Sequence, residues 1–210
     1  MKVFVTGGSR GIGAAIVNLF KREGHNVIFP TRKELNLLSP VTLNEISYDI
    51  IINNAGINVL SELANLQEQT TMQVNYFAPL SIIQQCLPYM ISQNYGRIIN
   101  IGSIWIDKAK PKRHSYAASK NALHALTKTI AAEYSQNNIL ANTISPGFIL
   151  TDLTKQNNSA EQLEQIVNEI PVKRFGLPEE IAKTVYHLTV ENTFITGQNI
   201  TIDGGYSCTA

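Results

Sequence analysis

Short apolar runs alternate along this chain with longer segments of helical periodicity. Several of the short runs are apolar on both faces, as strands of a parallel sheet covered by helices on both sides must be. The six runs that are typical of strands span Val3–Thr6, Asn26–Phe29, Tyr48–Ile52, Arg97–Ile101, Leu140–Ile144 and Asn199–Ile202. The helical segments between them span Ile12–Glu23, about Thr70–Ser92, Tyr116–Ser135, Glu161–Glu169 and Pro178–Leu188.

This alternation predicts a single α/β domain over residues 1–210. We expect a Rossmann-type, doubly wound parallel sheet of about seven strands, arranged as three layers α/β/α with right-handed crossovers. The region from the second to the fourth strand is short, because only Lys33–Asp49 is available there. We expect this interval to hold a short third strand near Leu35–Leu38 and a short helix near Val41–Ile46. Pro30 lacks the N–H that a strand ladder needs, which indicates that the second strand ends there.

A glycine-rich loop follows the first predicted strand and opens the first predicted helix. Glycines let backbone N–H groups approach an anion, and the helix N-terminus adds a positive dipole. The loop is therefore predicted to bind the phosphates of a dinucleotide, although a tight turn without a ligand is the alternative for a glycine cluster taken alone. The residues expected to contact the cofactor are Gly7, Ser9, Arg10, Gly11, Ile12 and Gly13.

The end of the second strand bears on the choice of cofactor. Folds that prefer NAD usually place an acid there for the ribose 2′-hydroxyl, but this chain has no acid before Glu34. Thr31 lies at this position, and Arg10 and Arg32 could clamp a 2′-phosphate, which guanidinium groups suit well. NADP(H) is therefore predicted over NAD(H), which stays open as the second cofactor; two solvated surface arginines are the alternative.

Tyr116 and Lys120 lie four residues apart on one predicted helix, so both side chains can point into one pocket. A cation near a phenol favours the phenolate and lowers its pKa, which would make Tyr116 an acid–base group. The spacing alone is weak, because eight tyrosines and eleven lysines in 210 residues give roughly 0.4 such pairs by chance. Position adds weight: Ser103 follows a strand at the edge where open α/β sheets bind ligands, and its hydroxyl could donate to a carbonyl oxygen.

The motifs together resemble the short-chain dehydrogenase/reductase family over essentially the whole chain. They occur in the family's order: Thr6-Gly7-(x3)-Gly11-x-Gly13, Asn53-Asn54-Ala55-Gly56, Asn75, Ser103, Tyr116-(x3)-Lys120, Pro146-Gly147 with Thr151, and Asp203-Gly204-Gly205. One motif alone is suggestive, whereas the ordered set is highly specific. A general similarity to 3-oxoacyl-carrier-protein reductases makes a β-keto thioester the first substrate to assay.

The resemblance implies a role for each catalytic position. Tyr116 would exchange the proton with the substrate oxygen, and Lys120 would lower the tyrosine pKa and hold the nicotinamide ribose. Ser103 would orient and polarise the substrate oxygen, and Asn75 would hold a water that connects Lys120 to solvent. Further cofactor contacts implied by the family are Asn36, Leu37, Asn53, Ala55, Gly56, Pro146, Gly147, Ile149 and Thr151, together with Tyr116 and Lys120.

Composition and charge limit the partners and the cellular location that we expect for this protein. The net charge of +1 gives no global field toward nucleic acid or an anionic membrane, so neither is expected as a partner. Cys86 and Cys208 are too few for a disulfide framework, and reduced thiols are expected. The N-terminus lacks a signal-peptide pattern, and no apolar run approaches the roughly 18 residues of a membrane span. A cytoplasmic protein without a metal site is predicted.

The segment between Ser103 and Tyr116 should flank the substrate entrance. It is dense in cations, namely Lys108, Lys110, Lys112 and Arg113. Such a run is usually an ordinary solvated face; the sharper hypothesis is an anionic or carrier-bound carbonyl or alcohol as substrate. Trp105, Ile106, Phe148 and Leu150 could form an apolar wall or simply pack in the core.

The family resemblance implies a homodimer or homotetramer through the helices Thr70–Ser92 and Tyr116–Ser135, whose alanines pack equally well within one subunit. An NAD-linked sugar or polyol dehydrogenase and a non-catalytic nucleotide sensor or scaffold remain alternative functions.

Overall fold

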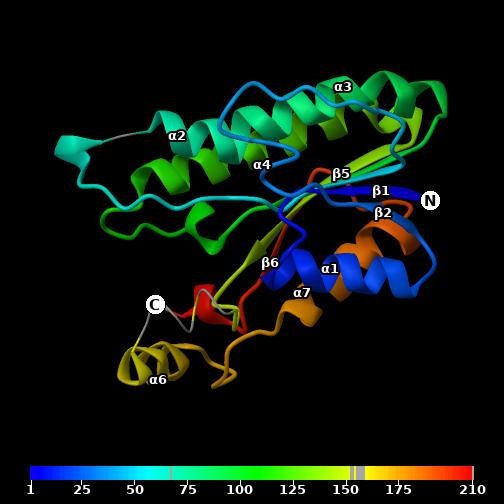
Figure 1. Ribbon diagram of the computed structural model, residues 1–210. Coiled ribbons are helices and arrows are strands. Elements are labelled where there is room, and N and C mark those ends of the chain that lie inside the picture. The colour runs from blue at the N-terminus through cyan, green and yellow to red at the C-terminus, as the bar shows by residue number, and fades with distance from the viewer. Residues whose placement is uncertain (67, 152–153, 155–158, 210) are drawn as a thin grey trace.

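The computed structural model describes residues 1–66, 68–151, 154 and 159–209. These residues form one parallel sheet of six strands in the order β2-β1-β3-β4-β5-β6 (Figure 1). Every neighbouring pair is parallel, so all six carboxyl ends meet at one edge of the sheet. The strands are β1 (Lys2–Val5), β2 (Asn26–Ile28), β3 (Ile50–Asn53), β4 (Gly96–Ile101), β5 (Ile139–Pro146) and β6 (Asn199–Ile202).

Helices cover both faces of this sheet. In Figure 1, α1 and α7 lie on one face and α3 and α4 on the other, which gives the predicted three layers and doubly wound arrangement. The α-helices are α1 (Gly11–Arg22), α2 (Gln69–Met72), α3 (Ala78–Ser92), α4 (His114–Tyr134), α6 (Ala160–Glu169) and α7 (Pro178–Tyr186). Among the described residues, none of the helices combines the length and apolar character needed to cross a membrane.

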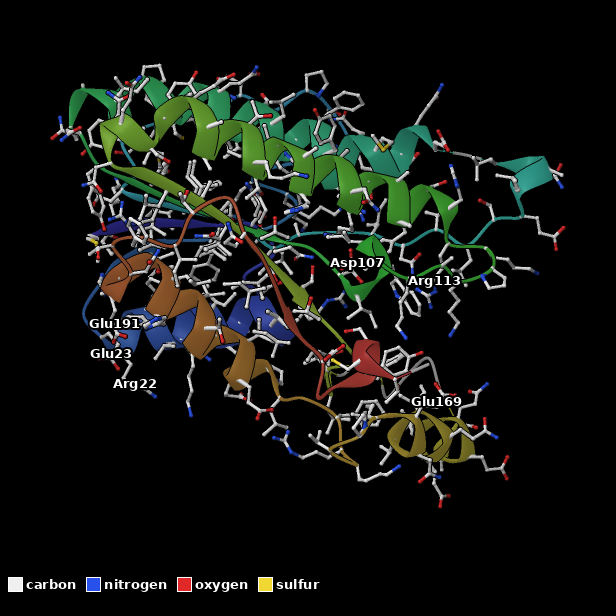
Figure 2. All side chains as sticks on the ribbon, turned by 180° about the vertical axis from the view of Figure 1, so that it is seen from behind. Arg22, Glu23, Asp107, Arg113, Glu169 and Glu191 are labelled. Carbon is white, nitrogen blue, oxygen red and sulfur yellow. The ribbon has the colours of Figure 1, made fainter. Side chains whose placement is uncertain are left out.

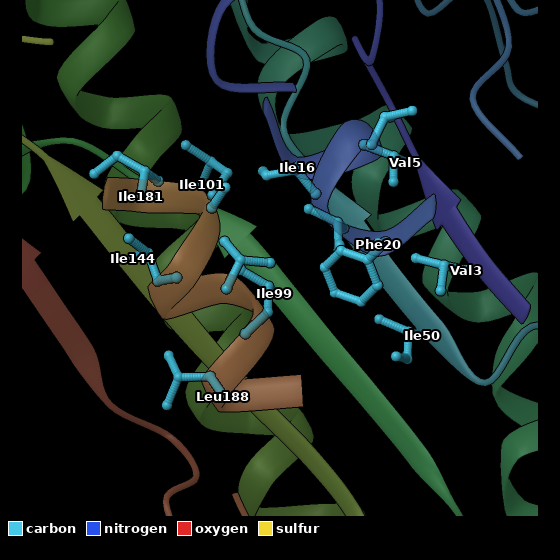
Figure 3. Packing of buried hydrophobic residues seen from close by; sticks show 14 of the residues in the cluster. Val3, Val5, Ile16, Phe20, Ile50, Ile99, Ile101, Ile144, Ile181 and Leu188 are labelled. Atoms are coloured by element: carbon cyan, nitrogen blue, oxygen red, sulfur yellow. The ribbon is translucent and has the colours of Figure 1, made fainter. Parts of the chain in front are cut away.

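The strands are apolar on both faces because each face meets its own helical layer. All residues of β3, β4 and β5 are buried. On the α1 and α7 face, Phe20 and Ile16 from α1 are fully buried against Val3, Ile50 and other branched side chains of the sheet (Figure 3). A second cluster fills the α3 and α4 face. The sheet is therefore held rigidly between two apolar layers.

The prediction of a third strand and a helix between β2 and β3 was wrong. Residues 29–49 form turns and irregular backbone without a strand or helix, so the sheet has six strands in the described residues, not about seven, and β2 is an edge strand. Side chains of neighbouring helices form hydrogen bonds with the backbone groups that a strand would have paired. Gln85 of α3 donates to the carbonyl of Val41 and accepts from the amide of Leu43, and Gln73 donates to the carbonyl of Leu37. The apolar residues that suggested a strand and a helix instead pack singly against the core.

The strand order creates a crevice at one point of the sheet. The chain leaves β1 through α1 to reach β2 on one side, and then passes to β3 on the other side of β1. The segments that follow β1 and β3 therefore diverge at their carboxyl ends, and such a switch point is where open α/β sheets bind ligands.

Candidate active site

A cleft of about 570 Å³ opens at the carboxyl ends of β1 and β3. Its floor is the glycine loop, where the backbone is crowded: a Cβ on Gly13 would lie 2.1 Å from the carbonyl oxygen of Gly7, and Gly7 itself has φ +66°. The N-terminal turn of α1 starts at Gly11, inside the cleft. Exposed backbone amides at a helix N-terminus suit a pyrophosphate, so the residues present fit a dinucleotide.

Most of the predicted cofactor residues line this cleft. The structure brings together Gly7, Ser9, Arg10, Gly11, Ile12, Gly13, Thr31, Arg32, Asn36, Leu37, Ala55, Gly56 and Thr151. These residues come from four separate stretches of the chain. Their convergence depends on the parallel register, which aligns the ends of β1, β2 and β3.

Six predicted cofactor residues do not line the cleft: Tyr116 and Lys120 of α4, and Asn53, Pro146, Gly147 and Ile149. Asn53 is 1% exposed and donates its amide to Asn100 at 2.9 Å, so its side chain joins β3 to β4 within the sheet. Pro146 and Gly147 lie at the carboxyl end of β5, and Ile149 lines a separate cavity of about 230 Å³ beside α7.

The structure adds lining residues that the sequence did not single out. Asn54 donates its side-chain amide to the carbonyls of Thr6 and Gly7, both at 3.0 Å, and thereby fixes the glycine loop. The sequence could have indicated Asn54 as a lining residue, because it belongs to the same motif as Asn53. The other additional lining residues are Thr6, Pro30, Leu35, Leu38, Ile57, Thr70 and Val74.

Ser103, Tyr116 and Lys120 come together beside this cleft, where the Lys120 ammonium lies 3.5 Å from the position of a Cβ on the lining residue Gly56. Ser103 follows β4, whereas Tyr116 and Lys120 lie one turn apart on α4. Lys120 is 3% exposed; its ammonium donates to the carbonyl of Ile101 at 2.6 Å and lies 5.7 Å from the centroid of the Tyr116 ring. The Ser103 hydroxyl hydrogen-bonds the phenol of Tyr116.

Burial sets the protonation of this group. Removal from water lowers the pKa of Lys120 from 10.5 to about 8, which still leaves the ammonium largely charged at neutral pH. Burial also raises the pKa of Tyr116, and the Ser103 hydrogen bond and the charge of Arg113 oppose this only in part. The side chains alone therefore do not lower the phenol pKa as expected from the sequence. The phenol of Tyr116 therefore keeps its proton at neutral pH.

Asn75 lies in a turn of π-helix, Gln73–Phe77, that interrupts the predicted helix Thr70–Ser92 between α2 and α3. Its side chain is fully buried and fully used: it accepts from the amide of Ile57 and donates to the carbonyl of Ile57, both at 2.9 Å. It also donates to the hydroxyl of Ser119 on α4. A Cβ on Gly56 would lie 3.3 Å from the Asn75 amide oxygen and 3.5 Å from the Lys120 ammonium, so these groups share one small space. Asn75 thus ties the loop after β3 to the helix that carries Tyr116.

Known proteins are similar to this chain over most of its length. The family described as enoyl-(acyl carrier protein) reductase matches residues 36–207. The chain is 33% identical over 235 positions to a 3-oxoacyl-(acyl-carrier-protein) reductase of Thermotoga maritima, covering 96% of this chain and 95% of that protein. The enzyme of the same name from Rickettsia conorii is 32% identical over 228 positions, covering 96% and 94%. The chain belongs to the short-chain dehydrogenase/reductase family.

Solved structures of this family agree with the fold. A 4-hydroxyisoleucine dehydrogenase complexed with NADH superposes with a TM-score of 0.87 at 28% identity, covering 100% of this chain and 99% of that chain. A short-chain dehydrogenase/reductase family protein superposes with a TM-score of 0.87 at 26% identity, covering 99% and 97%. The present short-chain dehydrogenase/reductase is thus an oxidoreductase that interconverts a carbonyl and an alcohol with a nicotinamide cofactor.

Proposed function

We propose that this enzyme is an NADP(H)-dependent reductase of a 3-oxoacyl thioester or a related anionic carbonyl compound. The observation that carries the proposal is the juxtaposition of Ser103, Tyr116 and the buried ammonium of Lys120 beside the cleft that the glycine loop lines. Relatives about one-third identical are named as 3-oxoacyl-(acyl-carrier-protein) reductases, which supports the substrate class.

The proposed chemistry divides between cofactor and protein. The reduced nicotinamide, when bound, supplies a hydride to the carbonyl carbon. The Ser103 hydroxyl donates to the carbonyl oxygen as negative charge develops, and Tyr116 gives that oxygen its proton. Lys120 keeps a positive charge beside the phenol that has lost its proton. Burial keeps the Tyr116 phenol protonated at neutral pH, which is the form that can protonate the oxygen during reduction.

The rim of the cleft supports NADP(H) over NAD(H). Arg10 and Arg32 both line the cleft, and within the described part of the chain neither guanidinium group has an ion pair or a side-chain hydrogen bond. Thr31 lies beside them. Two uncommitted guanidinium groups, one from the glycine loop and one from the segment after β2, suit a 2′-phosphate. Cofactor binding measured with NADPH and NADH tests this preference, and equal affinity or a preference for NADH would contradict it.

The proposed substrate entrance carries aromatic rings and cations. Trp105, Phe148 and Tyr206 form a row of edge-to-face contacts, with centroids 6.4 Å and 5.0 Å apart. Lys110 and Arg113 each lie 5.6 Å from the Trp105 ring. These two cations have no ion pair in the described structure, so they are the groups most available to an anionic substrate.

Two other cations of this loop are already engaged by the protein. Lys112 pairs with Glu62 at 3.1 Å, and Lys108 donates to the carbonyl of Thr209 at 3.2 Å. Charge reversal of Lys110 and Arg113, with reversal of Lys112 as the matched control, should therefore raise KM for a carrier-bound 3-oxoacyl thioester and weaken its salt dependence. An unchanged KM would leave the loop as an ordinary solvated surface.

A homodimer or homotetramer is proposed through the outer face of α3 and α4. The six alanines that suggested close helix packing are half-buried or exposed in the single chain, and none is buried: Ala117, Ala118, Ala122, Ala125, Ala131 and Ala132. Phe77 and Ile91 on the same layer are 49% and 39% exposed. Light scattering on the purified protein tests this, and a monomer at micromolar concentration would contradict it.

A further inference from the structure

The carboxylate of Glu34 lies on the two donors of the residue that follows β2. One oxygen, Oε2, accepts from the backbone amide of Thr31 at 2.7 Å and from the Thr31 hydroxyl at 2.8 Å. Both hydrogen bonds lower the pKa of Glu34, so this group is an anion throughout the neutral range. Thr31 lines the cleft, which places a fixed negative charge at its rim.

The neighbouring groups at this rim are cationic and uncommitted. Arg10 and Arg32 line the cleft with Thr31, and neither has an ion-pair partner among the residues that the structure describes. The glycine loop and the segment after β2 thus each offer one free guanidinium group to the cleft, and the segment after β2 adds one amide–hydroxyl donor pair that is already occupied by an anion of the chain itself.

We propose that Glu34 is a cofactor-specificity residue that occupies the Thr31 donors in the free enzyme and competes for them with a 2′-phosphate of the cofactor. This inference rests on the NADP(H) preference proposed above. A phosphate drawn in by Arg10 and Arg32 needs the donors that Glu34 holds, and two anions cannot share them without strong repulsion. NAD(H), which has no 2′-phosphate, does not need Glu34 to move. Glu34 therefore reduces the discrimination between the cofactors that the two arginines provide.

A purely structural role of Glu34 makes a different prediction. The amides of Glu34 and Leu35 both donate to the carbonyl of Thr31, so the same carboxylate also closes a turn. If closing the turn were its whole role, its removal would loosen Thr31. The affinity for a 2′-phosphate would then fall instead of rising.

The test measures binding without turnover. Adenosine 2′,5′-bisphosphate and AMP are titrated calorimetrically into wild-type enzyme, Glu34→Gln and Glu34→Ala, with urea unfolding of each variant as the folding check. We expect the bisphosphate to bind about threefold to tenfold more tightly to both Glu34 variants, because the competing charge-assisted hydrogen bonds are gone. The affinity for AMP should stay within about twofold of wild type.

Glu23→Gln is the matched control, because it removes the same charge at the far end of α1. The helix separates Glu23 from the cleft by about 18 Å, and Figure 2 shows Glu23 beside Arg22 and Glu191, at the end of the molecule away from Asp107 and Arg113. This variant should bind both ligands as wild type does. A similar gain in Glu23→Gln would show a general charge effect and overturn the proposal.

The outcomes separate this inference from the proposed cofactor preference. If wild-type enzyme binds AMP as tightly as the bisphosphate, the NADP(H) preference is contradicted. The role of Glu34 is tested separately, by the ratio of the bisphosphate affinity of each Glu34 variant to that of wild type. Unchanged or weaker binding of the bisphosphate to folded Glu34→Gln and Glu34→Ala overturns the role of Glu34. Failure of both nucleotides to bind any form contradicts both proposals.

Discussion

The side-chain amide of Asn75 donates a 2.9 Å hydrogen bond to the hydroxyl of Ser119, which in turn donates to the carbonyl of Tyr116 at 2.7 Å. These two bonds connect the π-helical turn before α3 to α4, the helix that carries Tyr116. They give Ser119 a positioning role: it orients Asn75, and through Asn75 the loop at Ile57 that borders the cleft.

Ser119→Ala should leave one buried N–H of Asn75 without an acceptor. We expect the free energy of unfolding to fall by about 1–3 kcal/mol and kcat to fall several-fold, with KM for the cofactor raised as the Ile57 loop loosens. Urea unfolding and steady-state kinetics measure these effects. Ser115→Ala is the matched control, because Ser115 is equally buried on the same helix and its hydroxyl has no hydrogen-bond partner in the described structure. Equal effects of both substitutions would remove the positioning role of Ser119.

Replacing Lys120 should separate activity from stability. Its buried ammonium is unfavourable in the folded state, and lowering its pKa from 10.5 to about 8 corresponds to about 3 kcal/mol. Lys120→Met should therefore abolish reduction while raising the free energy of unfolding at pH 7 by up to about 3 kcal/mol. Because the folded-state pKa is the lower one, wild-type stability should rise between about pH 8 and 10.5 and the variant should stay flat. A destabilised variant would contradict this account of Lys120.

The pH dependence of reduction should follow the same group. Lys120 loses its proton near pH 8, whereas burial keeps the pKa of Tyr116 above its ordinary value of 10. The value of kcat/KM for reduction should therefore be level below pH 8 and fall above it, well before the phenol titrates. A profile that stays level to pH 10 would show that the charge on Lys120 is not required.

Gly13→Ala should damage the cofactor cleft directly. The new methyl group would lie 2.1 Å from the Gly7 carbonyl oxygen and 2.5 Å from the amide nitrogen of Asn54, so the glycine loop must shift. We expect a loss of about 1–3 kcal/mol in stability and at least about tenfold weaker binding of AMP. Gly24→Ala is a suitable control: its φ of +79° carries strain, but nothing lies within 4 Å of its Cβ position. That variant should lose some stability and keep its nucleotide affinity.

Much of this architecture could be predicted from the sequence because the deciding patterns are local. Apolar runs such as Ile50–Asn53 identify buried parallel strands, and glycines before α1 identify a phosphate loop. The order of the motifs then places Ser103 and Tyr116 at one edge of the sheet. Local patterns also place the ends of the helices to within a few residues.

The errors arose where tertiary contacts decide. Leu35–Leu38 has the composition of a short strand, yet Gln73 and Gln85 satisfy the backbone of this region from neighbouring helices. The prediction that Asn53 contacts the cofactor stays a prediction; its motif does not reveal that its side-chain amide donates to Asn100 on the adjacent strand. The carboxylate of Glu34 accepts hydrogen bonds from Thr31. In the sequence only the short spacing between these two residues hints at this contact, and a spacing does not reveal which hydrogen-bond donors a carboxylate binds.

The most direct test of the central claim compares wild-type enzyme with Tyr116→Phe. Single-turnover reduction of a 3-oxoacyl thioester is followed by the loss of NADPH absorbance, and NADPH affinity is measured on the same samples. The account predicts that Tyr116→Phe keeps its cofactor affinity within about threefold and its fold, while the hydride-transfer rate falls by about 10²–10⁴. Tyr134→Phe, on the same helix, should match wild type. Hydride transfer in Tyr116→Phe at a rate close to wild type would contradict the assignment of Tyr116 as the proton donor.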